Sequence, residues 1–425
     1  MRLSVIGCGY LGAVHAAAMA SLGHSVVGID SDRSKVARLQ AGEAPFFEPG
    51  LPELLREGLA SGRLRFTSDL DAAAACRLHF VCVGTPQRAD GLGADLGDLE
   101  AVVTSLGPKL RNGAVLVGKS TVPVGTARRL ARAVSAAGAE LVWNPEFLRE
   151  GHAVSDTLAP DRIVYGLATP PSSAGSGVID ELYQPMLDAG VPRLTMSFES
   201  AELVKTSANS YLALRVSFIN GVADMADAAG ADVTDVASAL RLDERIGRLF
   251  LNPGLGFGGG CLPKDLRALT LRAEQLGVPK TASLLAAVDQ INSARPDRVV
   301  DLAAEALGGS VAGHRVAVLG LSFKPLSDDI RNSQSVVLAK RLAAAGAEVV
   351  ATDPQAARLA RQEHSSLGYA TTVREAVAGA DLVVLATEWE EYRSLNPVAV
   401  ATWTQARAVV DARLVLDPAE WSAAG

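Results

Sequence analysis

A glycine-rich turn between a short apolar strand and a helix is the feature that most constrains the fold of this chain. The motif Gly7–Gly12 (GCGYLG) follows a strand predicted over residues 2–7 and opens a helix predicted over 10–22. A second strand, over residues 25–30, ends at Asp30. Glycines in this pattern let the backbone turn tightly and let a pyrophosphate reach the N–H groups of a helix N-terminus. The pattern therefore predicts a parallel α/β sheet with a dinucleotide site.

The acid at the end of the second strand bears on which dinucleotide fits. Asp30 is placed to bind a ribose diol, and its charge would repel the 2′-phosphate of NADP. We therefore expect NAD as the cofactor, and we expect Lys35, as a lone lysine, to be exposed to solvent. The alternative is a glycine turn in an α/β fold that binds no ligand.

Strand-like and helical segments alternate along much of the chain. Further strands are predicted over residues 64–67, 78–83, 114–118 and 139–143. The pattern loosens over 160–195, where residues 170–177 resemble a surface loop. A long helix is predicted over 199–229, and more helices follow to about residue 307. Strands at 315–320 and 349–353 then resemble the first two strands of the chain, but no GxGxxG motif follows the first of them.

This order predicts two α/β domains on either side of a helical middle. We expect a Rossmann domain over 1–198, a central helical domain over 199–308 and a Rossmann-like domain over 309–425. Since the last domain lacks a GxGxxG pattern, it need not bind a dinucleotide.

Composition narrows the class of function and the compartment. The 425 residues carry 40 Lys and Arg against 47 Asp and Glu, and this net charge of −7 disfavours nucleic-acid binding. The 4 cysteines are widely spaced, so we expect no disulfide framework, no metal site and a reduced, cytoplasmic setting. The uncharged run over 3–23 is similar to a signal peptide, but glycines break it. No other run is apolar for long enough to cross a membrane.

One cysteine differs from the others in its surroundings. Cys261 lies between the glycine-rich stretch 254–260 and Pro263, a residue suited to the first turn of a helix. A helix N-terminus and the neighbouring Lys264 both lower a thiol pKa and favour the thiolate. On these features a reactive and a structural cysteine both stay open. Cys8, Cys76 and Cys82 are predicted as small packing residues.

Several polar residues lie where ligands bind in α/β proteins. Lys205 and Asn209 are one turn apart on the long helix, so they share a face and could donate to an oxyanion, or simply form a local pair. Asn144 to Glu146 is predicted to begin a short helix, which places Glu146 and Glu150 on one side or makes them ordinary first-turn acids. If the sheet is parallel, the segments 84–86 and 120–123 end their strands at the same edge as the glycine motif.

Taken together, these segments resemble the UDP-glucose 6-dehydrogenase family, within the UDP-glucose/GDP-mannose dehydrogenases. The matching segments run in family order over nearly the whole chain: 7–12, 84–86, 120–123, 144–151, 161–164, 202–209, 245–247, 256–265 and 323–331. The GFGGGCLPKD block at 256–265 is the most specific of them.

The resemblance implies an NAD-dependent, four-electron oxidation of UDP-glucose to UDP-glucuronate, a precursor for polysaccharide biosynthesis. Cys261 would be the nucleophile that forms a thiohemiacetal and then a thioester. Lys205 and Asn209 would stabilise the oxyanions, and Asp265, Thr121 and Glu150 would assist proton transfer and thioester hydrolysis. The resemblance also implies a homodimer, or a higher homo-oligomer, formed through the central domain.

The resemblance assigns the remaining residues to two binding sets. The NAD set comprises Gly7, Gly9, Tyr10, Leu11, Gly12, Asp30, Lys35, Thr85, Thr121, Glu150, Lys264 and Arg331. The nucleotide-sugar set comprises Glu146, Phe147, Leu148, Arg149, Glu150, Lys205, Asn209, Arg245, Phe250, Leu251, Asn252, Pro253, Gly254, Gly258, Lys324 and Arg413. Arg245 would reach the sugar site of a neighbouring subunit.

The chain departs from the family pattern at two places. Ala412 and Leu414 flank Arg413 where the family usually has Gly and Asn, and His152 replaces a small or polar residue. The alternatives are a sister enzyme for GDP-mannose or a UDP-N-acetylhexosamine, a two-electron hydroxyacid dehydrogenase, and a non-catalytic sensor of NAD or nucleotide sugar. A hydroxyacid dehydrogenase would not need Cys261, and a sensor would not need the catalytic set.

Overall fold

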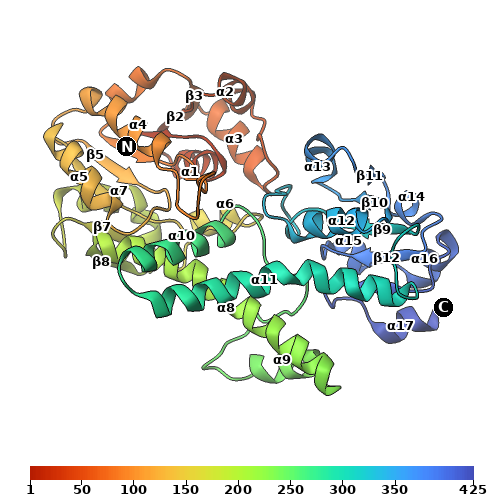
Figure 1. Cartoon of the computed structure of the whole chain (residues 1–425). Helices are drawn as coiled ribbons and strands as arrows, with labels where there is room; N and C mark the ends of the chain where they lie inside the picture. Colours follow the sequence, from red (N-terminus) through yellow and green to blue (C-terminus); the bar gives the residue numbers. More distant parts are fainter. The chain divides into compact units, whose positions relative to one another are not determined.

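The computed structural model describes all residues, 1–425 (Figure 1). It divides into two compact units. Unit 1 is Met1–Ala208 with Leu271–Gly277, and unit 2 is Asn209–Thr270 with Val278–Gly425. The three-domain division expected from the sequence stays a prediction.

Unit 1 is built on an eight-stranded sheet with the order β3-β2-β1-β4-β5-β6-β7-β8. The first six strands are parallel, and β6 pairs with β7 in the antiparallel direction. The central strands β4 and β5 are buried along their whole length because helices cover both faces of the sheet. The strands are β1 (Arg2–Ile6), β2 (Ser25–Ile29), β3 (Leu64–Thr67), β4 (Leu78–Val81), β5 (Val115–Gly118), β6 (Glu140–Trp143), β7 (Ile163–Leu167) and β8 (Arg193–Ser197).

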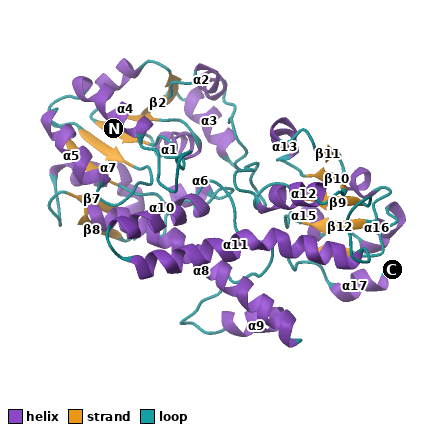
Figure 2. Ribbon diagram, in the orientation of Figure 1, coloured by secondary structure: helices purple, strands orange, loops and turns teal.

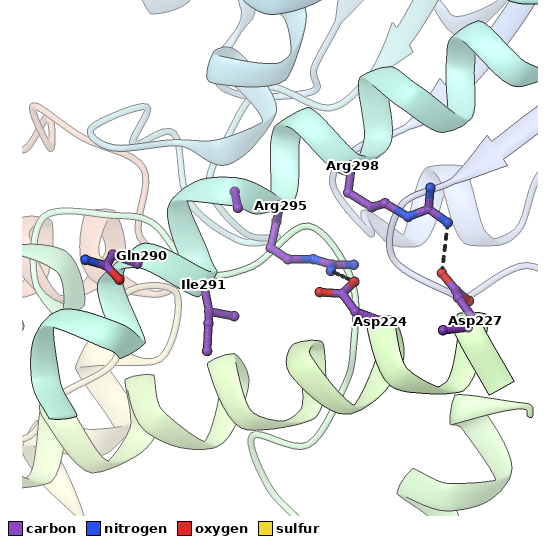
Figure 3. Close-up of a pocket in the computed structure, with 8 residues that line it drawn as sticks. Asp224, Asp227, Gln290, Ile291, Arg295 and Arg298 are labelled. Carbon is purple, nitrogen blue, oxygen red and sulfur yellow. Dashed lines mark hydrogen bonds and ion pairs between the residues drawn. The ribbon is translucent and has the colours of Figure 1, made fainter.

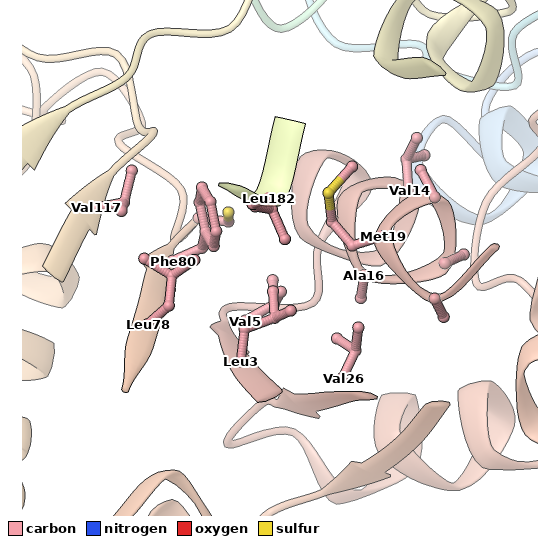
Figure 4. Packing of buried hydrophobic residues seen from close by; sticks show 14 of the residues in the cluster. Leu3, Val5, Val14, Ala16, Met19, Val26, Leu78, Phe80, Val117 and Leu182 are labelled. Atoms are coloured by element: carbon pink, nitrogen blue, oxygen red, sulfur yellow. The ribbon is translucent and has the colours of Figure 1, made fainter. Parts of the chain in front are cut away.

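Helix α1 (Tyr10–Ser21) is buried along most of its length, because its alanines let it lie close to the sheet. Figure 4 shows Val14, Ala16 and Met19 of this helix beside Leu3 and Val5 of β1. The other helices of unit 1 are α2 (Arg33–Gln40), α3 (Leu51–Ala60), η1 (Leu70–Ala75), α4 (Gly97–Leu106), η2 (Gly107–Lys109), α5 (Thr126–Ala136), α6 (Ala153–Leu158) and α7 (Ala174–Asp188).

Long helices form the first part of unit 2 (Figure 2). The Ser217 hydroxyl donates to the Val288 carbonyl at 2.7 Å, so α8 and α11 pack closely there. Small and apolar side chains, among them Ala213 and Val288, form the core between the helices. These elements are α8 (Phe198–Ala229), which begins in unit 1, α9 (Val233–Arg241), α10 (Leu262–Gln275), which ends in unit 1, and α11 (Pro279–Ala306).

The rest of unit 2 is a parallel five-stranded sheet with the order β11-β10-β9-β12-β13. Its strands are β9 (Arg315–Leu319), β10 (Glu348–Thr352), β11 (Gly368–Tyr369), β12 (Leu382–Leu385) and β13 (Val409–Asp411). Its helices are α12 (Gln334–Ala344), α13 (Ala357–Glu363), α14 (Val373–Val377), α15 (Glu390–Arg393), α16 (Pro397–Trp403) and α17 (Pro418–Ala423). The predicted fold class, two Rossmann-like sheets and a helical middle, is confirmed.

Two local expectations are wrong. The stretch 170–177 is not all loop, because Ser173 and Ser176 form a capping box that starts α7. Asn144 to Glu146 begins no helix. The Asn144 side chain donates to the Val164 carbonyl at 2.9 Å instead of capping a helix, since a tertiary partner is within reach. No helix combines the length and the apolar run needed to span a bilayer.

Candidate active site

The glycine motif leaves the N-terminus of α1 open to an anion. Gly7 has φ +85°, and a Cβ at Gly12 would lie 1.8 Å from the Gly7 carbonyl oxygen, so both positions need glycine. A Cβ at Gly9 would meet no atom within 4 Å, so there is free space beside the turn. No side chain caps the helix at Gly9. The free space and the uncapped N–H groups fit the pyrophosphate of a dinucleotide.

Asp30 is buried at the end of β2 and is held in place by three donors. Its Oδ2 accepts from the Cys8 N–H at 2.8 Å and from Lys35 Nζ at 3.0 Å. Its Oδ1 accepts from the Asp32 N–H at 3.0 Å. Lys35 is therefore an ion-pair partner of Asp30, its side chain is 28% exposed, and the expectation of a lone lysine is wrong.

The three strand ends predicted to share one edge do share it. β4, β5 and β6 are parallel neighbours, so Thr85, Thr121 and Asn144 all follow carboxyl ends of adjacent strands. The Thr85 hydroxyl donates to the Thr121 carbonyl at 2.7 Å, which ties the first two ends together. Lys119 Nζ donates to Asn144 Oδ1 at 3.0 Å, which joins the end of β5 to the end of β6.

Lys205 and Glu146 form a buried ion pair in unit 1. Lys205 Nζ lies 3.0 Å from Glu146 Oε1, and the Lys205 side chain is 5% exposed. The cation also lies 5.7 Å from the centre of the Phe147 ring, and the Arg162 guanidinium lies 3.8 Å from the same centre. The structure thus brings together Glu146, Phe147 and Lys205, three members of the predicted sugar set.

Two buried ionisable residues near these strand ends were missed as candidates. Burial lowers the pKa of the Lys119 ammonium. Its signal in the sequence was a lysine at the end of an apolar strand run. Glu202 accepts from the Gly125 and Ala127 N–H groups, both at 2.6 Å, and so caps α5. Burial raises the pKa of Glu202 to about 7. No local spacing predicts this cap, because its partners lie far away in the sequence.

In unit 2, Cys261 immediately precedes α10 and is exposed. The Asp265 N–H donates to the Cys261 carbonyl at 2.9 Å, which places the cysteine at the first turn. Asp265 is buried, and its two carboxylate oxygens accept from Asn209 Nδ2 and Lys264 Nζ, both at 2.6 Å. Four of the predicted functional residues therefore meet at the start of one helix.

The other three cysteines are buried, as expected of packing residues. Burial raises the pKa of Cys82 to about 12, and it also raises the pKa of Cys8 and Cys76. A thiolate at these positions is therefore disfavoured. Cys261 differs from them in exposure and in its place at a helix N-terminus.

The glycines before Cys261 are required by close neighbours. A Cβ at Gly258 would lie 2.4 Å from the Asn332 carbonyl oxygen, and one at Gly260 would lie 2.5 Å from the Arg331 guanidinium carbon. The Gly259 N–H donates to the Arg331 carbonyl at 2.9 Å. The structure thus places Arg331, a member of the predicted NAD set, directly beside the stretch that leads to the cysteine.

Of the predicted sugar residues in unit 2, Arg413 and Gly254 lie together, whereas Arg245 pairs elsewhere. Arg413 Nη1 donates to the Gly256 carbonyl at 3.1 Å, and a Cβ at Gly254 would lie 2.7 Å from the Ala412 carbonyl oxygen, so Arg413 and the 254–256 stretch are together. Arg245 is not among them. Its exposed side chain pairs with Asp243 at 2.6 Å. Leu414, which departs from the family pattern, has φ +54°.

A pocket of about 660 Å³ lies between α8 and α11 in unit 2. Figure 3 shows Arg295 and Arg298 of α11 pointing toward Asp224 and Asp227 of α8. The Arg295–Asp224 and Arg298–Asp227 distances are 2.5 and 3.0 Å. None of these residues belongs to the predicted catalytic or binding sets, and their charges are paired within the pocket.

Three family models match consecutive parts of the chain. They describe the NAD binding domain of the UDP-glucose/GDP-mannose dehydrogenase family over residues 1–187, its central domain over 199–294 and its UDP binding domain over 317–418. The match to the first domain, together with the open N-terminus of α1, identifies NAD as the cofactor.

Named relatives cover nearly the whole chain. The UDP-glucose 6-dehydrogenase of Rhizobium meliloti is 40% identical over 93% of this chain and 91% of its own length. That of Pseudomonas aeruginosa is 39% identical over 100% and 96%. A UDP-glucose dehydrogenase structure from Pyrobaculum islandicum matches with a TM-score of 0.90 at 39% identity, over 100% of this chain and 95% of that one. A UDP-D-ManNAc dehydrogenase from Pyrococcus horikoshii is 26% identical, with a TM-score of 0.86, over 98% and 96%.

Proposed function

Since this chain belongs to the UDP-glucose/GDP-mannose dehydrogenase family, we propose that it oxidises UDP-glucose to UDP-glucuronate by covalent catalysis at Cys261. The observation that carries the proposal is the surroundings of this thiol. It is exposed at the start of α10, and the buried Asp265 in the same turn is held by Asn209 and Lys264. A nucleophile at a helix N-terminus beside amide and ammonium donors suits addition to a carbonyl.

The reaction converts the C6 alcohol of the sugar to a carboxylate in two oxidations. When bound, NAD supplies the hydride acceptor for each of them. The first oxidation gives an aldehyde, and the Cys261 sulfur then bonds to its carbon, which makes a thiohemiacetal. Oxidation of the thiohemiacetal gives a thioester. Water breaks the C–S bond, which releases the acid and restores the thiol.

The chain's own residues divide the remaining work. Lys205 and Asn209 donate to the oxygen that becomes negative as the thiol or water adds. Asp265 fixes the Asn209 amide through the 2.6 Å hydrogen bond. Glu150 and Asp265 take the protons released in addition and hydrolysis, and the Thr121 hydroxyl orients the water molecule through which they pass.

The two binding sets complete the proposal. Asp30 and Lys35 hold the adenosine ribose, while Thr85, Lys264 and Arg331 bind elsewhere along NAD. Glu146 to Glu150, residues 250–254, Gly258, Lys324 and Arg413 bind the nucleotide sugar. Relatives near 40% identity are named for UDP-glucose, whereas the UDP-D-ManNAc enzyme is 26% identical, and this favours glucose over a sister substrate.

We also propose a homodimer through the central helices, with Arg245 serving the partner's sugar site. Tyr211, Phe218 and Met225 are exposed on α8. They are spaced by seven residues, so they form one apolar face of the helix. The cytoplasm is the proposed compartment, because the cysteine content indicates a reduced setting.

The Cys261→Ser variant tests the covalent step. We expect it to lose conversion of UDP-glucose to UDP-glucuronate by about 10³-fold or more, because a serine hydroxyl is a far weaker nucleophile at neutral pH. NAD binding, measured by fluorescence titration, should be unchanged. The matched control is Cys76→Ala, which alters a buried cysteine outside the site and should keep turnover. Full turnover by Cys261→Ser would refute the thioester route.

A further inference from the structure

A buried carboxylate lies between the dinucleotide turn and the loop that carries Glu150. Glu48 comes from the irregular segment between α2 and α3, and the residue is 2% exposed. Its Oε2 accepts from the Gly151 N–H at 2.6 Å and from the Tyr10 hydroxyl. Its Oε1 accepts from the Ala153 N–H at 2.7 Å. Both carboxylate oxygens are therefore occupied by donors from two separate segments.

These two segments carry predicted functional residues. Tyr10 is the first residue of α1 and directly follows Gly9 of the dinucleotide turn. Gly151 directly follows Glu150 and turns the chain with φ +78°. The Gly151 N–H also donates to the Tyr10 hydroxyl at 2.9 Å, so phenol, carboxylate and peptide form a closed set of hydrogen bonds.

The kind of donor that Glu48 accepts from indicates that this carboxylate positions its neighbours rather than stabilising the fold. The donors to Glu48 are backbone N–H groups and a phenol, and burying a carboxylate among neutral donors is costly. Well-packed apolar residues commonly stabilise a fold as much as a buried charge does. What a carboxylate adds is geometry, because it accepts from Tyr10, Gly151 and Ala153 at once and fixes the distances between them.

We propose that Glu48 is a positioning residue for the reaction, which holds the loop ending at Glu150 against the first residue of α1. The inference rests on the proposed function, since it requires Glu150 to touch the reacting groups or the cofactor. It adds a link between the dinucleotide turn and the loop that presents the predicted proton acceptor. Tyr10 is the second member of this link.

The Glu48→Gln variant tests the inference. An amide must point its NH₂ group at the Tyr10 and Gly151 side or at the Ala153 N–H, so at least one donor then faces another. We expect kcat with UDP-glucose and NAD to fall about tenfold or more, because small displacements of catalytic groups are costly. The KM for UDP-glucose and the Kd for NAD should change by less than about threefold. The matched control is Glu53→Gln on α3, whose side chain is 60% exposed.

A second variant keeps the test decisive if Glu48→Gln does not fold. Tyr10→Phe removes only the hydroxyl that Glu48 and Gly151 share, and it should lower kcat in the same sense by about threefold to tenfold. The double variant should fall no further than about twofold below Glu48→Gln, because both changes break one set of contacts.

Two results would overturn the inference. One is a kcat for Glu48→Gln, or for Tyr10→Phe if only that variant folds, equal to that of Glu53→Gln. The other is a loss of kcat that merely parallels a loss of NAD binding and of the thermal unfolding midpoint. The wild-type protein separates this failure from failure of the proposed function. If wild type does not form two NADH per UDP-glucose, the function is wrong, whatever Glu48 does.

Discussion

Buried ionisable side chains in unit 1 differ in how their burial is compensated. Lys119 donates to Asn144, and Glu202 accepts from two backbone N–H groups. His15, on α1, is 1% exposed, and neither of its ring nitrogens has a hydrogen-bond partner in the protein. Its ring packs against Phe80, with 4.3 Å between the ring centres. The desolvation of the His15 ring is therefore not offset by any hydrogen bond within the protein.

This makes His15 a source of acid sensitivity. Burial, assisted by the Lys119 charge, holds the pKa of the His15 imidazole well below its usual range. Below about pH 6.5 the unfolded chain binds a proton that the folded chain does not, so stability falls as pH falls, by up to about 1.4 kcal/mol per pH unit. We expect His15→Leu to unfold with the uptake of about one proton fewer, so that its free energy of unfolding depends less steeply on pH, and to be more stable than wild type at pH 7. Urea unfolding of both proteins between pH 7.5 and 5 measures this pH dependence. An unchanged slope would show that His15 titrates normally.

Some residues of the site could be predicted from the sequence and others could not. Cys261 could be found because glycines, Pro263 and Lys264 mark it within ten residues. Glu48 could not, because its partners Tyr10 and Gly151 become neighbours only through the fold. The pairing of Lys35 with Asp30 was missed for a similar reason, since a spacing of five residues matches neither helical pair spacing and the turn after β2 brings the two side chains together.

At the level of elements, the pattern of apolar residues in the sequence was enough to predict most buried strands and the longest helix. The strands β1 to β6 are predictable because each is a short apolar run between turn signals, and α8 because no proline interrupts it. Strands β7 and β8 were missed, since the reversal of direction after β6 leaves no mark in composition. Helix α7 was obscured by Pro170-Pro171 and the serines that cap it.

The exposed face of α8 leads to an element-scale prediction. If Tyr211, Phe218 and Met225 are covered by a second copy, Phe218→Glu should give a monomer, because two carboxylates would be buried without cations. Mass measured by light scattering after gel filtration tests this. Val398→Glu, at an exposed apolar residue of α16, is the control and should keep the mass of wild type. The proposal fails if wild type is a monomer, or if both variants stay dimeric.

At the scale of the whole molecule, the two sheets use the acid after their second strand differently. Asp30 accepts from the Cys8 N–H, and so lies beside a glycine turn that has free space next to Gly9. Asp353, after β10, accepts from the Leu321 and Ser322 N–H groups at 2.8 and 2.9 Å and from Trp389 Nε1 at 3.1 Å. Both acids accept several hydrogen bonds, but an indole lies against Asp353 and no GxGxxG motif stands beside it. The structure therefore offers no dinucleotide site at Asp353 comparable to the one at Asp30.

The number of NADH molecules formed per sugar tests the central claim most directly. The protein is incubated with excess NAD and a limiting, known amount of UDP-glucose, and NADH and sugar products are then quantified. Two NADH per UDP-glucose, with UDP-glucuronate as the product, is the predicted result. One NADH per sugar, or turnover with another nucleotide sugar and none with UDP-glucose, would contradict it.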